Sequence, residues 1–184
     1  ILRRLIALAL ILCMLTALTA EIFAANIIAS GNCGANGSNL TWTLDSEGTL
    51  TISGKGEMSN YTNMSPWGYY SWYKKETQIR TVIIESGVTT IGNYAFYGEA
   101  NLTNISVPDG IASIGTMAFE GCKKLDGIIL PNSLTEIGQS AFSVCTNLTS
   151  IALPEKLEKI DWYAFSGCTG LTEIIIPQSV TYIG

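Results

Sequence analysis

Two consecutive stretches of 23 residues decide the fold: LTNISVPDGIASIGTMAFEGCKK at residues 102–124 and LDGIILPNSLTEIGQSAFSVCTN at residues 125–147. Aligned without gaps, the two stretches share a first Leu, a Pro at the seventh position, Ile-Gly, Ala-Phe and a Cys near the end. The same spacing continues outward and gives a column of phenylalanines at Phe96, Phe119, Phe142 and Phe165. A fixed period of this length predicts a solenoid, in which each repeat forms one coil stacked on the coil before it.

Each repeat divides into two halves with different patterns. The frame gives four full units and a truncated fifth: 79–101, 102–124, 125–147, 148–170 and 171–184. In the first half, Ile105 and Val107 alternate with polar residues before Pro108, which predicts a short parallel strand that the proline ends. In the second half, the spacing of Ile114 and Phe119 favours a short helix or turn across the back of the coil. The predicted fold is a leucine-rich-repeat solenoid with one strand and one short helix or turn per coil.

Two strings resemble one subclass of these repeats. They are Ile-Pro-x-Ser-Val-Thr-x-Ile-Gly at 176–184 and Ala-Phe-x-x-Cys-x-x-Leu-Thr-x-Ile at 141–151. Both are similar to the BspA-type (treponemal) leucine-rich repeat of bacterial surface proteins. The resemblance implies a secreted or cell-surface protein that attaches to host matrix proteins, other bacteria or epithelial cells. It carries over no particular binding residue.

The first 25 residues are predicted to be an export signal. Arg3 and Arg4 precede a continuous apolar run from Leu5 to Leu15, and small residues follow that run. The run is shorter than the roughly 20 residues that a membrane span needs, although an uncleaved anchor remains the alternative. A secreted or cell-surface location follows, with membrane contact only during export. Because the sequence stops inside a repeat at Gly184, we expect it to be a fragment of a longer protein.

Residues 26–78 are predicted to form an N-terminal cap. Apolar and polar residues alternate over 39–53, and Gly48 falls at the turn of the hairpin that this pattern predicts. A dense aromatic segment follows at 61–73. Its rings either fill the core of the cap or stack on a sugar. The candidate glycan-contact residues are Trp67, Tyr69, Tyr70 and Trp72.

The sequence lacks the residues of most catalytic and metal sites. It contains no histidine, which removes the commonest general base and metal ligand. Its net charge is −5 and no run of Lys or Arg exceeds two, so we expect no nucleic-acid partner. Cys122, Cys145 and Cys168 form a column whose linear arrangement does not suit a tetrahedral metal site or an unstrained disulfide. We predict four free thiols in the mature chain, the fourth being Cys33, and neither a cofactor nor a catalytic residue.

The outward side of the predicted strands is the candidate ligand-binding face. The candidate residues there are Ile83, Asn104, Ser106, Ile129, Ser150, Ala152, Glu173 and Ile175. Three isoleucines in an outward column indicate contact with a partner or with a neighbouring segment. The preference of isoleucine for strands is the competing explanation. The predicted function is non-catalytic, adhesin-like binding of a host or bacterial surface protein or glycan. The alternative is a targeting or spacer module of a larger surface enzyme whose catalytic domain lies beyond Gly184.

Overall fold

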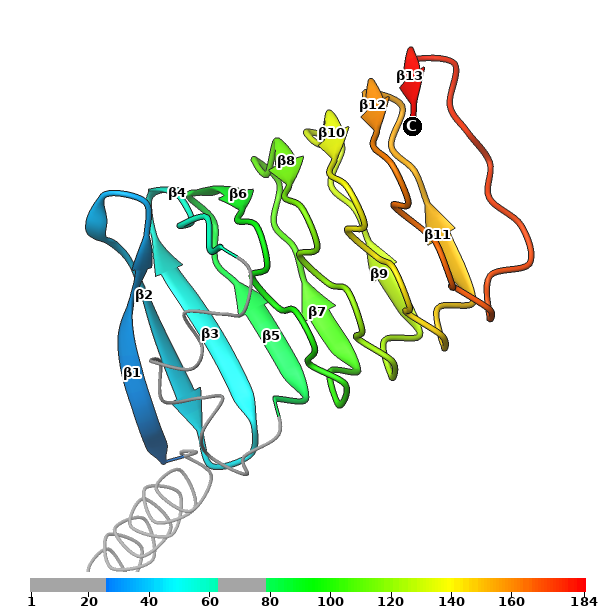
Figure 1. Cartoon of the computed structure of the whole chain (residues 1–184). Helices are drawn as coiled ribbons and strands as arrows, with labels where there is room; N and C mark the ends of the chain where they lie inside the picture. The colour runs from blue at the N-terminus through cyan, green and yellow to red at the C-terminus, as the bar shows by residue number, and fades with distance from the viewer. Residues whose placement is uncertain (1–25, 63–78) are drawn as a thin grey trace, which may run out of the picture.

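The computed structural model describes residues 26–62 and 79–184, which form a row of stacked coils that begins at an antiparallel hairpin (Figure 1). All regular structure in these residues is β-strand, arranged in three sheets. The first sheet has the order β1 (Ile27–Gly34), β2 (Gly37–Asp45), β3 (Thr49–Gly54), β5 (Thr81–Ile84), β7 (Asn104–Ser106). The second has the order β13 (Tyr182–Ile183), β12 (Lys159–Ile160), β10 (Glu136–Ile137), β8 (Ser113–Ile114), β6 (Val88–Ile91), β4 (Gly56–Glu57). The third pairs β11 (Ser150–Ala152) with β9 (Gly127–Ile129). Within the described residues, no helix is long and apolar enough to cross a membrane.

The coils contribute strands to two rows, β5, β7, β9 and β11 on one side and β6, β8, β10 and β12 on another (Figure 1). Paired strands in both rows are parallel, and residues one repeat apart are partners, as in Thr81↔Asn104 and Ile114↔Ile137. These pairings confirm the predicted solenoid with parallel strands. The prediction of one strand per coil is wrong. The second strand was missed because a two-residue strand such as β8 is too short to show alternation.

Of the short helix or turn predicted for the back of each coil, the structure shows the turn, and the described residues there form no helix. Met117 has a left-handed φ of 54° and Gly121 one of 76°, which interrupts any helical run. The backbone amides of Met117, Phe119 and Gly121 donate to carbonyls of the next coil, each at 2.8 Å. In an α-helix each amide would instead bond the carbonyl four residues earlier. Pairing between coils therefore replaces helix formation, and the apolar spacing alone did not distinguish the two.

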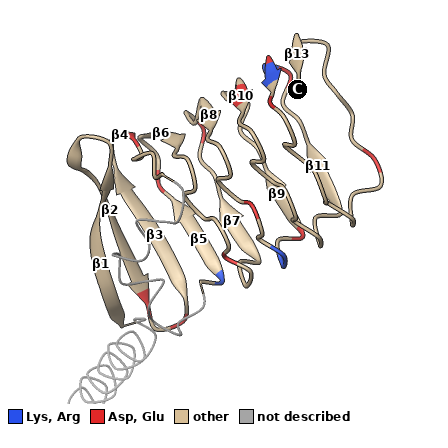
Figure 2. Ribbon diagram, viewed as in Figure 1, with Lys and Arg blue, Asp and Glu red and all other residues tan. Residues whose placement is uncertain are grey.

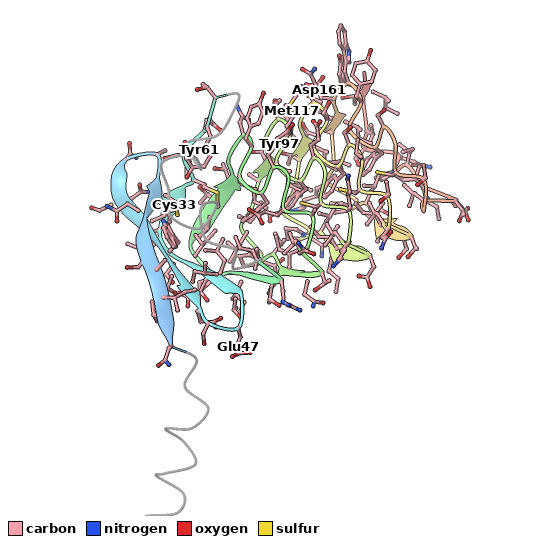
Figure 3. The ribbon with its side chains drawn as sticks, turned by 60° about the horizontal axis from the view of Figure 1, so that its bottom comes forward. Cys33, Glu47, Tyr61, Tyr97, Met117 and Asp161 are labelled. Carbon is pink, nitrogen blue, oxygen red and sulfur yellow. The ribbon has the colours of Figure 1, made fainter. Side chains whose placement is uncertain are left out.

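The predicted hairpin over 39–53 is confirmed by the antiparallel pairing of β2 with β3. Gly48 lies at its turn with φ of 84°, and the Asp45 carboxylate accepts a hydrogen bond from the Thr49 amide at 2.8 Å. Figure 3 shows Glu47 at the tip of this turn. Strand β3 then pairs in parallel with β5, with Leu50 opposite Val82. The hairpin therefore continues the first sheet of the solenoid and occupies the edge that β5 would otherwise leave open.

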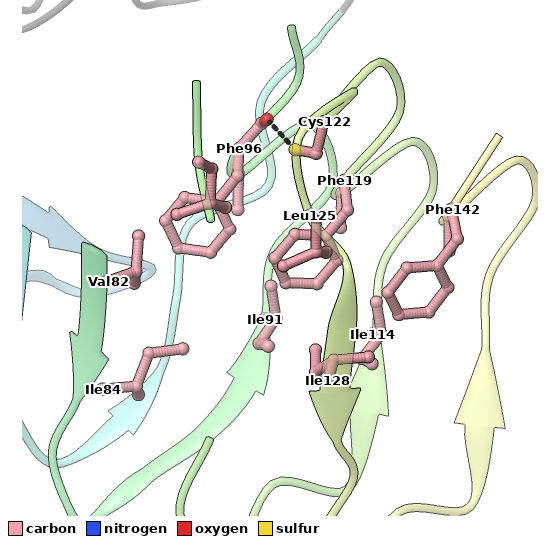
Figure 4. Close-up of a cluster of buried hydrophobic side chains, with 14 of the residues drawn as sticks. Val82, Ile84, Ile91, Phe96, Ile114, Phe119, Cys122, Leu125, Ile128 and Phe142 are labelled. Atoms are coloured by element: carbon pink, nitrogen blue, oxygen red, sulfur yellow. Dashed lines mark hydrogen bonds between the residues drawn. The ribbon is translucent and has the colours of Figure 1, made fainter. Parts of the chain in front are cut away.

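A stack of phenylalanine rings runs through the interior of the coils (Figure 4). Ring centroids lie 5.2 Å apart for Phe96 and Phe119, 5.2 Å for Phe119 and Phe142, and 5.5 Å for Phe142 and Phe165. The first three rings are almost completely buried. The 23-residue period of the sequence is therefore the period of this core, because each coil adds one ring to the stack.

The cysteine column lies beside the rings and is held by hydrogen bonds between coils. The thiol of Cys122 donates to the Phe96 carbonyl at 3.2 Å, a contact drawn in Figure 4. Cys145 and Cys168 repeat this bond one and two coils later, at 3.1 and 3.0 Å. Burial raises the pKa of the Cys145 thiol to about 12. All four cysteines of the described residues, Cys33 included, are free and buried, as predicted.

Candidate ligand-binding face

Alternation within the short strands sorts side chains into inner and outer positions. In β5, Val82 and Ile84 are buried, whereas Ile83 between them points outward and is 39% exposed. The equivalent residue of β9, Ile129, is 86% exposed, and Ile175 of the last coil is 76% exposed. We call the surface that carries these outward residues, at positions 81–83, 104–106, 127–129, 150–152 and 173–175, the strand face.

The structure brings all eight predicted residues together on the strand face, in two adjoining depressions. The first, of about 560 Å³, is lined by residues of β5, β7, β9 and β11. The second, of about 460 Å³, extends over the last coil to Glu173 and Ile175. Ser150, Ile151 and Ala152 line both of them. The face is therefore one continuous surface that runs across the coils.

Large and small side chains alternate along the centre of the strand face. Ser106 is the partner of Ile83 in the sheet, and Ala152 is the partner of Ile129. The next coil again carries an isoleucine, Ile175. The result is three ridges separated by two notches, with Ser106 and Ala152 at the bottom of the notches.

Only acidic side chains bring charge to the lining of the two depressions. They are Asp126, Glu155 and Glu173, and no Lys or Arg is among the described lining residues. Arg80 and Lys156 are the basic residues adjacent to the lining in sequence. Figure 2 shows the charged residues mostly at the ends of the strands and in the loops, so the middle of the face is uncharged. Among the residues that the structure describes, no aromatic side chain lines either depression.

The second row of strands carries a different surface, which the sequence analysis did not predict. A groove of about 320 Å³ follows its outer side and is polar: its lining includes Glu57, Asn60, Thr90, Asn93, Ser113, Thr116, Glu136 and Asp161. Lys159 forms ion pairs with Glu136 at 2.7 Å and Asp161 at 3.0 Å. A hydrogen bond from the Trp162 amide, followed by that from Lys159, lowers the pKa of Asp161. The ion pairs satisfy two of the three carboxylates that line this groove.

One half-buried carboxyl group interrupts the cysteine column. Glu99 holds, in the first coil, the position that Cys122, Cys145 and Cys168 hold later. Burial raises its pKa from 4.5 to about 7. Burial raises the pKa of the Cys122 thiol well above its usual value, and the neighbouring Cys145 and Glu99 add to that shift. The described residues contain no group of three or more His, Cys, Asp or Glu arranged to hold a metal ion.

The four candidate glycan-contact residues, Trp67, Tyr69, Tyr70 and Trp72, lie outside the described residues. Exposed aromatic side chains occur elsewhere, at Tyr97, Trp162, Tyr163 and Tyr182. The Tyr97 ring lies 5.7 Å from that of Tyr94, and the Lys159 ammonium lies 5.7 Å from the centre of the Tyr182 ring. These rings lie away from the strand face, since none of them lines its depressions.

Fold, repeat length and outward face together define a leucine-rich-repeat solenoid. Residues 68–184 match the family described as BspA type Leucine rich repeat region, in six copies. The chain therefore belongs to the BspA-type leucine-rich-repeat family.

Solved structures with the same fold come from other bacteria. A leucine-rich repeat protein from Eubacterium ventriosum is 29% identical, with a TM-score of 0.67 over 85% of this chain and 40% of that protein. The T. pallidum leucine-rich repeat protein is 25% identical, with a TM-score of 0.52 over 78% of this chain and 83% of that protein. The chain thus spans less than half of the Eubacterium protein. The comparison with curated proteins found no match.

Proposed function

We propose that this chain is a non-catalytic, adhesin-like module that is exported to the cell surface or secreted and binds a protein partner through the strand face. The observation that carries the proposal is the exposure of Ile129, 86% of whose surface is open to solvent in β9, the third strand of the first row. Exposed apolar side chains that gather on one surface favour burial against a partner, because burial removes them from water.

The composition of the strand face supports a protein partner over a glycan. Sugar recognition commonly uses an aromatic ring as a platform, and the described lining residues of both depressions include none. Their apolar members are aliphatic, as in Ile83, Ile129 and Ile175. Aliphatic ridges match the apolar side chains that a protein segment presents.

A binding role also accounts for the chemistry of the described residues. The sequence has no histidine, and the carboxyl group with the most strongly raised pKa, Glu99, lies in the core column rather than on the strand face. Leucine-rich-repeat proteins of this family are generally non-catalytic. Export of the chain rests on the predicted signal at residues 1–25.

Cell-binding measurements test the proposal. Fluorescently labelled wild-type protein and an Ile129→Asp variant are titrated onto cultured epithelial cells and onto immobilised matrix proteins. We expect saturable binding by the wild type and at least about tenfold weaker binding by Ile129→Asp, since the new carboxylate would be buried in the contact. Val144→Asp is the matched control, because Val144 is 38% exposed and does not line the strand face.

Circular dichroism establishes that both variants remain folded. Equal binding by the wild type and Ile129→Asp would contradict the proposal. So would the absence of saturable binding to every surface, which is the result that a spacer predicts.

A further inference from the structure

The ridges and notches of the strand face constrain the conformation of what lies on them. Adjacent strands of a sheet lie about 4.8 Å apart, so the notches at Ser106 and Ala152, two coils apart, are separated by roughly 9.6 Å. The phenylalanine rings in the interior advance 5.2 Å per coil, which is close to the distance of about 4.8 Å between adjacent strands. Ile129 stands between the notches as a ridge that is 86% exposed. A segment that fills both notches must therefore keep the space above Ile129 clear.

The three regular peptide conformations differ in whether they meet this requirement. A β-strand presents side chains to one face every second residue, about 6.7 Å apart, which is too short for the notches. An α-helix places residues i and i+7 about 10.5 Å apart, but residues i+3 and i+4 lie on the same face and would collide with the Ile129 ridge. A polyproline II helix has three residues per turn and a rise of about 3.1 Å, so residues i and i+3 lie about 9.3 Å apart with no side chain between them on that face.

Charge restricts the occupant further. Asp126 comes directly before β9, Glu173 holds the first strand-face position of the last coil, and Glu155 follows β11, so carboxylates lie at both edges of the face. None of the described lining residues is basic. A segment with Lys or Arg beside its apolar residues would meet opposite charge at both edges, whereas an acidic segment would be repelled.

We propose that the strand face binds an extended, basic segment of a partner protein in the polyproline II conformation, with two aliphatic side chains three residues apart seated in the notches at Ser106 and Ala152. This inference rests on the proposed function and specifies its ligand class. Peptides of this kind bury little surface, so a short one binds in the micromolar range or more weakly.

Synthetic peptides of equal composition test the spacing. The probe is Lys-Pro-Leu-Pro-Pro-Leu-Pro-Lys, with its leucines three residues apart, and the control is Lys-Pro-Leu-Pro-Leu-Pro-Pro-Lys, with its leucines two apart. Both carry a fluorophore, and binding to the purified protein is followed by fluorescence anisotropy. We expect the probe to bind about tenfold more tightly than the control, to weaken as salt is added, and to lose its affinity when glutamates replace its lysines.

Variants that fill the notches test whether the peptide binds at Ser106 and Ala152. Ser106→Leu and Ala152→Leu each occupy one notch at an exposed site, so we expect the fold to persist and the probe to bind at least about tenfold more weakly. Ala112→Leu is the matched control, because Ala112 is exposed and lines neither depression of the strand face; it should bind the probe like the wild type. Two notch variants are used so that the test stands if one of them fails to fold.

The outcomes separate this inference from the function on which it rests. Equal affinity for probe and control, tighter binding of an alanine-rich helical peptide with leucines seven residues apart, or indifference to both notch variants would each overturn the polyproline II occupant. If no peptide binds while cell binding still depends on Ile129, the occupant is wrong and the proposed function stands. If no peptide binds and cell binding does not change in Ile129→Asp, both are wrong.

Discussion

The same coils present two outward surfaces of opposite character. Along the strand face, the central positions carry isoleucine in every second coil, including Ile129. Along the second row of strands, the outward positions carry Thr90, Ser113, Glu136 and Lys159, and the last two form an ion pair. Both surfaces are made of parallel strands, so the preference of isoleucine for strands applies to both. Since only one surface is apolar, this preference alone does not explain the exposed isoleucines, which supports the proposed partner for the strand face.

Replacing a core residue that supports both surfaces should destabilise both of them, and this has the largest expected effect. Phe142 is fully buried, with ring neighbours in the coils before and after it. Replacing it by alanine, Phe142→Ala, should lower the free energy of unfolding by about 3–5 kcal/mol, because a large cavity opens in the stack. Urea denaturation followed by circular dichroism measures the change. A loss below about 1 kcal/mol would mean that the stack does not hold the coils together.

Glu99, which replaces a cysteine in the first coil, makes the stability of the fold depend on pH. Folding raises the pKa of Glu99 from 4.5 to about 7. Between these values the folded state binds more protons than the unfolded state, so the contribution of Glu99 to stability is fully present below pH 4.5 and is lost as the pH rises through 7. Glu99→Gln should remove this decline and stabilise the protein at pH 8 by up to roughly 3 kcal/mol. Urea denaturation at several pH values measures it.

Glu47→Gln, at the exposed tip of the hairpin, is the matched control for the change of side chain and should alter the free energy of unfolding by no more than about 0.5 kcal/mol. A pH profile of Glu99→Gln that coincides with the profile of the wild type would show that the Glu99 carboxyl group is solvated.

A charge introduced on the strand face is expected to weaken binding without lowering the stability of the fold. Because the Ile129 side chain is mostly solvent-exposed, Ile129→Asp should change the free energy of unfolding by no more than about 0.5 kcal/mol. The loss of binding described above, at least about tenfold, corresponds to roughly 1.4 kcal/mol. Denaturation and cell binding are measured on the same preparation. A destabilisation of several kcal/mol would instead make Ile129 a structural residue.

The smallest effect concerns backbone strain away from both strand surfaces. Val144 adopts a left-handed φ of 59°, at a position where the other coils have Gly98, Gly121 and Gly167. A β-branched residue is disfavoured there, so Val144→Gly should raise the free energy of unfolding by about 0.5–1 kcal/mol. Thermal denaturation shows whether the midpoint increases. A lower midpoint would mean that the packing of the Val144 side chain outweighs its backbone strain.

The parts of the fold that the sequence predicted are those in which one residue type recurs for one physical reason. Phe96, Phe119 and Phe142 are buried, as are the three cysteines of the column, so the spacing of these residues reports the stacking directly. Asp45 and Gly48 mark the hairpin turn because the turn needs a side-chain acceptor and a left-handed residue. Alternation around Ile83 and Ile129 correctly placed the outward residues on one face.

The missed features depend on contacts between coils, which a single repeat does not reveal. Met117 and its neighbours bond to the next coil rather than within a helix. The outward column that contains Ser113 and Glu136 belongs to two-residue strands, whose existence depends on pairing with adjacent coils. The notches also became visible only when Ser106 and Ala152 were seen as partners of isoleucines in neighbouring strands.

The most direct test of the central claim compares the two surfaces in one binding measurement. Labelled wild-type protein, Ile129→Asp on the strand face and Thr116→Asp in the polar groove of the second row are titrated onto epithelial cells. We predict that Thr116→Asp binds with the affinity of the wild type and that Ile129→Asp binds at least about tenfold more weakly. Equal loss in both variants, or loss in Thr116→Asp alone, would contradict the assignment of binding to the strand face.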